Sequence, residues 1–103
     1  MKKYTVKHYH TKAIGLTYED FKVKVEYTED SIEAGSSKEA ATIAHGLYNG
    51  YTMKDLEPNP TSPCRTIRER MEDEVVFDGK NADGGDVYHY DSIANHWIIV
   101  EEV

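Results

Sequence analysis

The stretch DFKVKVEYTE, residues 20–29, carries the clearest strand pattern in the chain. Apolar and polar side chains alternate through it, and the apolar ones are Phe21, Val23, Val25 and Tyr27. Alternation with a period of two is typical of a β-strand with one face buried and the other in water. We therefore expect a strand over these residues, with its apolar face packed on a core.

A second strand is expected just before it, in KKYTVKHYH, residues 2–10. If this segment is extended, one of its faces carries Tyr4, Val6, His8 and His10. The connecting segment TKAIGLTYE, residues 11–19, contains a glycine and fits a loose hairpin. These two strands are thus expected to lie side by side.

The main helix is predicted over residues 36–49. Ser36 followed three residues later by Glu39 forms a capping box, which marks the start of a helix. Gly50 is a typical helix stop, and Gly46 inside the helix predicts a close packing contact. One apolar stripe runs along the helix, made of Ala40, Ile43, Ala44, Leu47, Tyr48 and Tyr51.

The segment after this helix is broken by prolines in EPNPTSP, residues 57–63. Because Pro63 suits the first position of a helix, a second, short helix is predicted over about residues 63–73. This helix would run into a strand at residues 74–77. The turn-forming sequence DGKNADGGD, residues 78–86, then predicts a hairpin to a strand at residues 87–91.

The chain closes with SIANH, residues 92–96, which suits a single helical turn, and with WIIVEEV, residues 97–103. The latter is apolar on both faces, so we expect a central strand that is covered on both sides. The whole order predicts a single α+β domain over residues 1–103. It would hold an antiparallel sheet of about four or five strands, one main helix and the second short helix.

Composition restricts the classes of function. A single cysteine, no apolar run long enough for a membrane span and no secretion signal predict a cytoplasmic protein. The net charge is −7, and residues 71–103 hold nine acids against Lys80 alone. This balance argues against direct binding of nucleic acid, because phosphate contacts need basic residues. It favours a partner protein with a positive surface.

Catalytic motifs fail in detail, so the chain is not expected to be an enzyme. Cys64 and Arg70 have the spacing of a phosphate-binding loop, but bulky residues and Glu69 stand between them. The calcium-loop pattern fails at Lys80 and Ala82. No cofactor is expected.

Metal or small-ligand binding is the alternative function. His8 and His10 share one strand face, and His89 and Asp91 share a face of another strand. If these strands were neighbours, four ligands would converge on a metal, with His96 also available. No Cys-x-x-Cys or paired helical histidines anchor such a site.

The leading hypothesis is a non-enzymatic, acidic binding protein that occludes a basic surface on a protein that handles nucleic acid. Its size, acidity and lack of catalytic motifs resemble the general type of phage and mobile-element inhibitors, including anti-CRISPR and anti-restriction proteins. A homo-oligomeric structural domain is a third hypothesis. Tyrosine is favoured at binding hot spots, and four tyrosines are expected to be partly exposed: Tyr9, Tyr18, Tyr88 and Tyr90. The predicted partner-binding residues are Glu69, Glu72, Asp73, Glu74, Asp78, Asp83, Asp86, Tyr88 and Tyr90.

Overall fold

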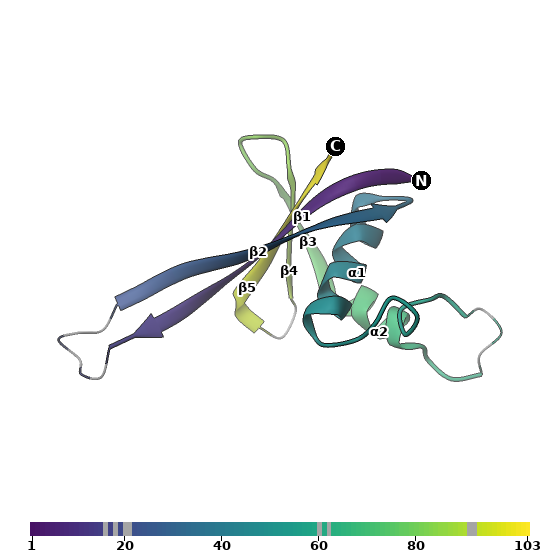
Figure 1. The fold of residues 1–103 in the computed structure, drawn as a ribbon, viewed down its shortest axis with the longest axis horizontal. Coiled ribbons are helices and arrows are strands. Elements are labelled where there is room, and N and C mark those ends of the chain that lie inside the picture. Colours follow the sequence, from purple (N-terminus) through teal and green to yellow (C-terminus); the bar gives the residue numbers. More distant parts are fainter. Residues whose placement is uncertain (16, 18, 20–21, 60, 62, 91–92) are drawn as a thin grey trace.

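Five strands and two helices follow one another along the chain (Figure 1). The computed structural model describes residues 1–15, 17, 19, 22–59, 61, 63–90 and 93–103. The elements in order are β1 (Lys2–Ile14), β2 (Lys22–Ala34), α1 (Ser37–Tyr48), α2 (Ile67–Glu74), β3 (Val75–Lys80), β4 (Asp86–Tyr90) and β5 (Ile93–Glu102). The predicted α+β class is therefore confirmed, with two helices and a five-stranded sheet.

The strands form one antiparallel sheet in the order β2-β1-β5-β4-β3. The predicted hairpin of the first two strands is present, and β5 is central, as its apolar sequence predicted. The first and last strands pair with each other, and the Val103 N–H donates to the Lys3 carbonyl at 2.9 Å. The two ends of the chain therefore lie side by side (Figure 1).

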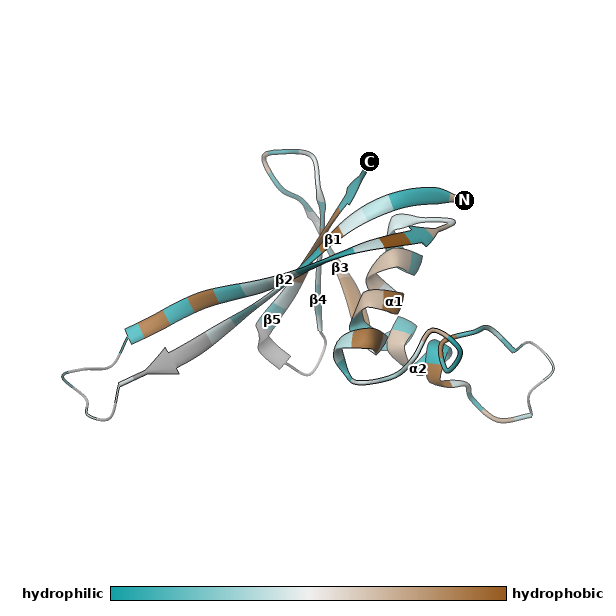
Figure 2. Ribbon diagram, viewed as in Figure 1, coloured by the Kyte–Doolittle hydropathy of each residue, from teal (hydrophilic) through white to brown (hydrophobic). Residues whose placement is uncertain are grey.

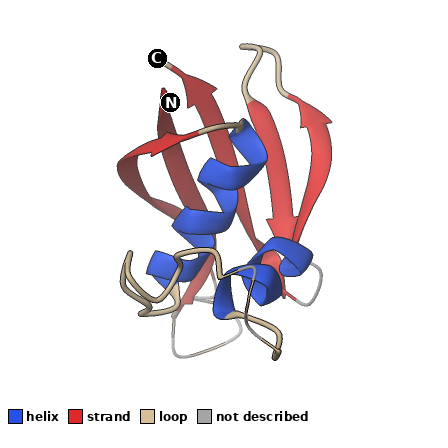
Figure 3. Cartoon of the chain, turned by 90° about the vertical axis from the view of Figure 1, so that its right-hand side faces the viewer, coloured by secondary structure: helices blue, strands red, loops and turns tan. Residues whose placement is uncertain are grey.

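Both helices pack on the same face of the sheet, which we call the covered face (Figure 3). Because strand side chains alternate between faces, every second residue of each strand points to the covered face. The core between the two layers holds mainly Tyr4, Val6, Ile32, Ala40, Ala41, Ile43, Ala44, Leu56, Met71, Val75, Tyr88, Tyr90, Ile98 and Val100. Neither helix has the length or the apolar run that crossing a bilayer requires, within the part of the chain that is described.

The start and the close packing of α1 confirm what its sequence predicts. The Ser36 side chain accepts a hydrogen bond from the Glu39 N–H at 3.2 Å and so caps the helix. Gly46 lies against the fully buried Leu56, and a Cβ at position 46 would stand 2.4 Å from a methyl carbon of that leucine. Past the C-cap residue Asn49, Gly50 takes a φ of 91°, a conformation that glycine adopts without strain.

The second helix is shorter than predicted and begins later. Thr66, rather than the Ser62–Pro63 pair, caps it by accepting a hydrogen bond from the Glu69 N–H at 3.2 Å. It ends at Glu74, and the chain passes directly into β3 at Val75. Short polar side chains compete for capping sites, and here the threonine next to the apolar Ile67 provides the cap.

Three further expectations are corrected by the structure. Val23, Val25 and Tyr27 form a strand but are 61%, 52% and 57% exposed, because they lie on the face of the sheet opposite to the one that the helices cover. Residues 93–96 belong to β5 and not to a helical turn. β5 itself is covered by a helix on one face only. Phe21 and Tyr18 lie outside the described residues.

Candidate functional site

The face of the sheet opposite the helices, which we call the open face, carries a row of large side chains. Five residues in this row are consecutive partners across all five strands. From edge to edge they are Tyr27 on β2, Tyr9 on β1, Trp97 on β5, His89 on β4 and Val76 on β3. Residues that face one another across neighbouring strands lie close enough for their side chains to contact.

The aromatic rings of this row are ordered against one another. The Tyr9 and Trp97 rings are parallel within 1°, with centroids 5.4 Å apart, and the Tyr9 and Tyr27 centroids are 5.1 Å apart. The Lys7 ammonium lies 5.9 Å from the centroid of the Tyr27 ring. Offset stacking and cation–π contact hold such side chains in place. The row therefore presents a preformed aromatic surface, with Tyr27 as its most exposed member.

The row is the centre of a wider apolar area. Val23 and Val25 continue it along β2, and Ile99 and Val87 occupy the next row across the sheet. Charged residues border it, because Lys7 lies opposite Glu29 and Lys3 lies opposite Glu33. At the far edge, the Asp78 carboxylate is 3.9 Å from the His89 ring. An apolar centre with a charged rim is the usual composition of a protein–protein contact surface.

The covered face holds a second group of unusual residues, a cluster of four histidines. His8 and His10 come from β1, His45 from α1 and His96 from β5. His8 is 2% exposed and its ring stacks on Tyr48 at 3.8 Å, while the His96 ring lies 5.5 Å away. The His10 and His96 centroids are 5.8 Å apart. The histidines of this cluster thus lie in a common layer between β1, β5 and α1.

Two members of the cluster are firmly bound. The His45 ring nitrogen Nε2 donates to Glu74 of α2 at 2.6 Å, while Asn49 donates to Nδ1 at 3.1 Å. His10 forms an ion pair with Glu26 at 3.2 Å. By contrast, neither ring nitrogen of the buried His8 has a hydrogen-bond partner among the described residues.

Burial makes this layer a poor place for positive charge. Burial, together with the nearby His96, His10 and His45 rings, lowers the pKa of His8 to about 4. Burial also lowers the pKa of His96. On the neighbouring strand, burial raises the pKa of the Tyr90 hydroxyl. His8 is therefore held neutral at neutral pH.

Only some of the residues predicted as metal ligands lie together in the structure. His8, His10 and His96 lie together, but His89 is on the open face, opposite to the others. The reason is the register, since His89 lies opposite Trp97 while His10 lies opposite His96, one position along β5 and on the other face. In addition, β5 separates β1 from β4. Asp91 lies outside the described residues. Among the residues that are described, no three His, Cys, Asp or Glu side chains are arranged to hold a metal ion.

The predicted acidic contact surface is divided by the fold. Glu69, Glu72, Asp73 and Glu74 lie on α2, whereas Asp78 and Asp83 lie on the β3–β4 hairpin, which leads away from that helix (Figure 1). Two of the acids are neutralised locally, in the ion pairs Arg65–Asp73 and Lys80–Asp86, and Glu74 accepts a hydrogen bond from His45. The predicted acidic residues therefore do not form one continuous surface.

Two of the predicted contact residues are corrected outright. Tyr88 and Tyr90 are each only 3% exposed, because the face of β4 that they share with Asp86 is the covered face. Tyr88 shares a hydrogen bond of 2.6 Å with the Ser37 hydroxyl at the start of α1. Sequence alternation placed these residues on one face correctly, but it could not say which face the helices cover.

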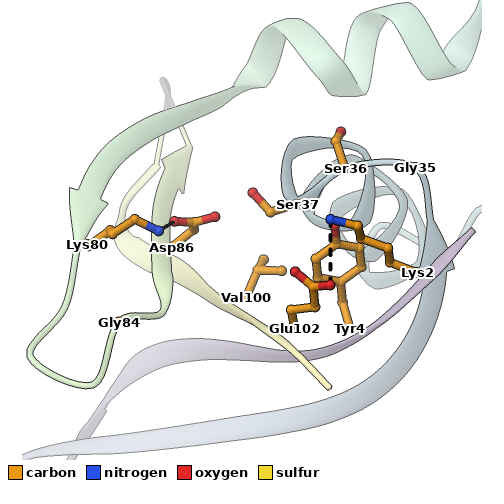
Figure 4. A pocket seen from close by; sticks show the side chains of 10 residues that line it. All are labelled: Lys2, Tyr4, Gly35, Ser36, Ser37, Lys80, Gly84, Asp86, Val100 and Glu102. Carbon is orange, nitrogen blue, oxygen red and sulfur yellow. Dashed lines mark hydrogen bonds and ion pairs between the residues drawn. The ribbon is translucent and has the colours of Figure 1, made fainter.

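A polar hollow of about 360 Å³ lies at the start of α1 (Figure 4). Its two lysines are already bound to carboxylates, Lys80 to Asp86 at 2.7 Å and Lys2 to Glu102 at 3.6 Å. The Lys80 ammonium also holds the pKa of the Asp86 carboxyl below its usual range. Because the charges cancel inside the hollow, it has no net attraction for an anion.

The open face thus gathers the exposed Val23, Val25 and Tyr27 with the half-buried Tyr9 and Trp97. Such a row of aromatic and apolar side chains suits contact with a macromolecule. The aromatic row was missed at the sequence level because it depends on the β1–β5 pairing. The one available signal was that Tyr9 and Trp97 fall on strand positions opposite to the core residues. Comparison of the chain with protein-family models, curated proteins and solved structures finds no match.

Proposed function

We propose that this protein is a non-enzymatic binding protein that contacts a partner protein through the open face of its sheet. The observation that carries the proposal is the aromatic row, in which Tyr27, Tyr9 and Trp97 are ordered by stacking on a face without helices. Large aromatic side chains held in one conformation lose little entropy on binding and often supply most of the binding energy.

The charge of the chain supports a partner with a positive surface. On the open face itself, Lys3 and Lys7 lie opposite Glu33 and Glu29, so little net charge remains there. The net charge of −7 comes from the rest of the molecule and acts at longer range. Apolar contact would hold the complex, and charge would steer its formation. That the partner handles nucleic acid stays a prediction from the sequence.

The experiment is affinity capture from a host lysate, followed by calorimetry with the captured protein. The test variant combines Tyr9→Ala and Tyr27→Ala, which removes two rings of the row. Because a hot-spot residue contributes about 2 kcal/mol or more, the loss of one such contact should lower affinity by about thirtyfold and the loss of both by about several hundredfold. Raising the salt concentration should slow association more than it speeds dissociation.

The matched control reverses charge on α2, with the exposed Glu69→Lys and Glu72→Lys combined. The proposal predicts that this control keeps the rings of the open face and most of the affinity. If the α2 control abolishes binding while the ring variant binds normally, the contact surface is the acidic helix and the proposal is overturned. Circular dichroism of each variant checks that the fold is kept.

A further inference from the structure

The β1–β2 hairpin extends beyond the rest of the sheet as a two-stranded arm, residues 11–14 and 22–25 (Figure 1). β5 pairs with β1 only from Tyr4 to His10, so no third strand adjoins the arm in the described structure. A two-stranded ribbon alone is only marginally stable in water. The arm is therefore a segment that gains stability from an additional strand.

The two edges of the sheet differ in how they are protected. The β3 edge is six residues long and is interrupted by a bulge between Phe77 and Gly79. The β2 edge is thirteen residues long, and its register with β1 runs without interruption from Lys22 to Ala34. Short strands, bulges and charged side chains, lysine above all, are the usual devices that prevent edge pairing. β3 is short and bulged, whereas β2 is neither and relies on lysines, of which Lys24 is paired with Glu26 at 3.7 Å.

The side chains along the outer half of β2 are self-complementary. Apolar and charged residues alternate there (Figure 2), with Val23, Val25 and Tyr27 on the open face and Lys24 and Glu26 on the other face. Three apolar side chains in a row on one face of an edge strand are seldom this strongly exposed. Opposite charges two residues apart on one face are suited to an antiparallel copy of the same strand.

We infer that two copies of this chain pair antiparallel through β2, about a twofold axis at Val25. In this register Val25 faces Val25 of the second copy, and each Val23 faces a Tyr27. Each Lys24 faces Glu26 of the second copy, so the contact contains two ion pairs. All three apolar residues thereby gain apolar neighbours, and the pairing extends over residues 22–28 of each strand.

Neighbouring registers match less well. An axis at Lys24 or at Glu26 places two like charges directly opposite each other, which is unfavourable across strands. An axis at Thr28 sets each Glu26 against Asp30. An axis at Tyr27 pairs Lys24 with Asp30 but leaves Val25 facing Glu29. The axis at Val25 alone among these five satisfies both the charged and the apolar positions.

The dimer has a simple geometry. A twofold axis through an antiparallel strand pair makes the same surface of both copies meet, which is the commonest form of homodimer. The sheet continues from one copy into the other, and the two open faces lie on the same side. The inference stands on the arm of β2, so it holds or fails independently of the binding function proposed above.

The first experiment is sedimentation equilibrium of the full chain over a range of concentrations. We expect a monomer–dimer equilibrium. Lys24→Glu places four acids at the contact and should weaken the dimer by about tenfold or more. The double variant Lys24→Glu with Glu26→Lys exchanges the two charges and should restore dimerisation. A chain that stays monomeric at all concentrations, or a double variant no better than Lys24→Glu, overturns the inference.

The second experiment fixes the register by cross-linking, in a Cys64→Ser background. Directly opposed residues on paired strands lie about 4.5–5.5 Å apart, within reach of a disulfide. Val25→Cys should therefore form a covalent dimer under mild oxidation. The control Tyr27→Cys should not, because in this register the two Tyr27 positions are four residues apart along the strands. Cross-linking at position 27 and not at 25 would refute the proposed axis.

Discussion

Replacing His8 by phenylalanine tests how the buried histidine cluster limits stability in acid. His8 is 2% exposed, stacks on Tyr48 and has two ring nitrogens without hydrogen-bond partners among the described residues. Phenylalanine keeps a flat ring at this position and removes both nitrogens. Since a buried unpaired polar atom costs about 1–3 kcal/mol, we expect the variant to be at least as stable as the parent chain at pH 7.

The magnitude of the pH effect follows from the pKa of His8, which falls from 6.5 to about 4 on folding. The unfolded chain takes up a proton on His8 as the pH falls below about 6.5, and the folded chain does so only near pH 4. Stability is therefore lost as the pH falls through this window. At about 1.4 kcal/mol per pKa unit, the loss is about 2 kcal/mol by pH 5 and about 3 kcal/mol by pH 4.

The other titratable groups that face His8 remain in the variant. They come from every element packed around it and are His10, His45, Tyr48, Glu74, Tyr90 and His96. The lowered pKa of His96 adds acid sensitivity of the same sign to both chains. The difference between the two chains therefore isolates most of the contribution of His8.

The assay is urea unfolding at a series of pH values, followed by the fluorescence of Trp97. The difference in free energy of unfolding between His8→Phe and the parent chain should grow by about 2 kcal/mol in favour of the variant between pH 7 and pH 5. His89→Gln, which changes a histidine on the open face, is the control and should keep the acid sensitivity of the parent. Parallel stability curves for His8→Phe and the parent would refute the reasoning.

Two further predictions concern helix α1. Gly46→Ala raises helix propensity but forces a methyl group against Leu56, so we expect a net loss of about 1–2 kcal/mol in thermal or urea unfolding. Leu56→Ala should remove that clash, so the double variant should lose less stability than the sum of the two single variants. A double-mutant cycle in which the two losses of unfolding free energy simply add would contradict the contact. Ser36→Ala deletes the cap on the Glu39 N–H and should lower stability by about 1 kcal/mol. Ser31→Ala, on the exposed part of β2, is its control and should change little.

Much of the fold was predictable because its signals are local. The capping pair Ser36 and Glu39 lie three residues apart, and the alternation in β2 lies within one strand. Each therefore appears in the sequence before any tertiary contact is known. The cap of α2 was misplaced because Ser62 and Thr66 both suit that role, and the choice depends on where the helix packs.

The candidate site was not predictable, because it rests on contacts between distant segments. Tyr9 and Trp97 are 88 positions apart and meet only through the β1–β5 pairing. The burial of Val23 and Val25 was wrongly predicted for a related reason. Alternation reports that a strand has two different faces, but it does not report which of them the helices cover, and these valines lie on the face without helices.

The pairing of β1 with β5 also affects how the chain folds during its synthesis. β1 leaves the ribosome before β2 and β5, and it lies between them in the finished sheet. Its second neighbour, β5, is synthesised only after both helices and the β3–β4 hairpin. The nascent chain must therefore carry an incomplete sheet, with one side of β1 unpaired, until β5 has been made.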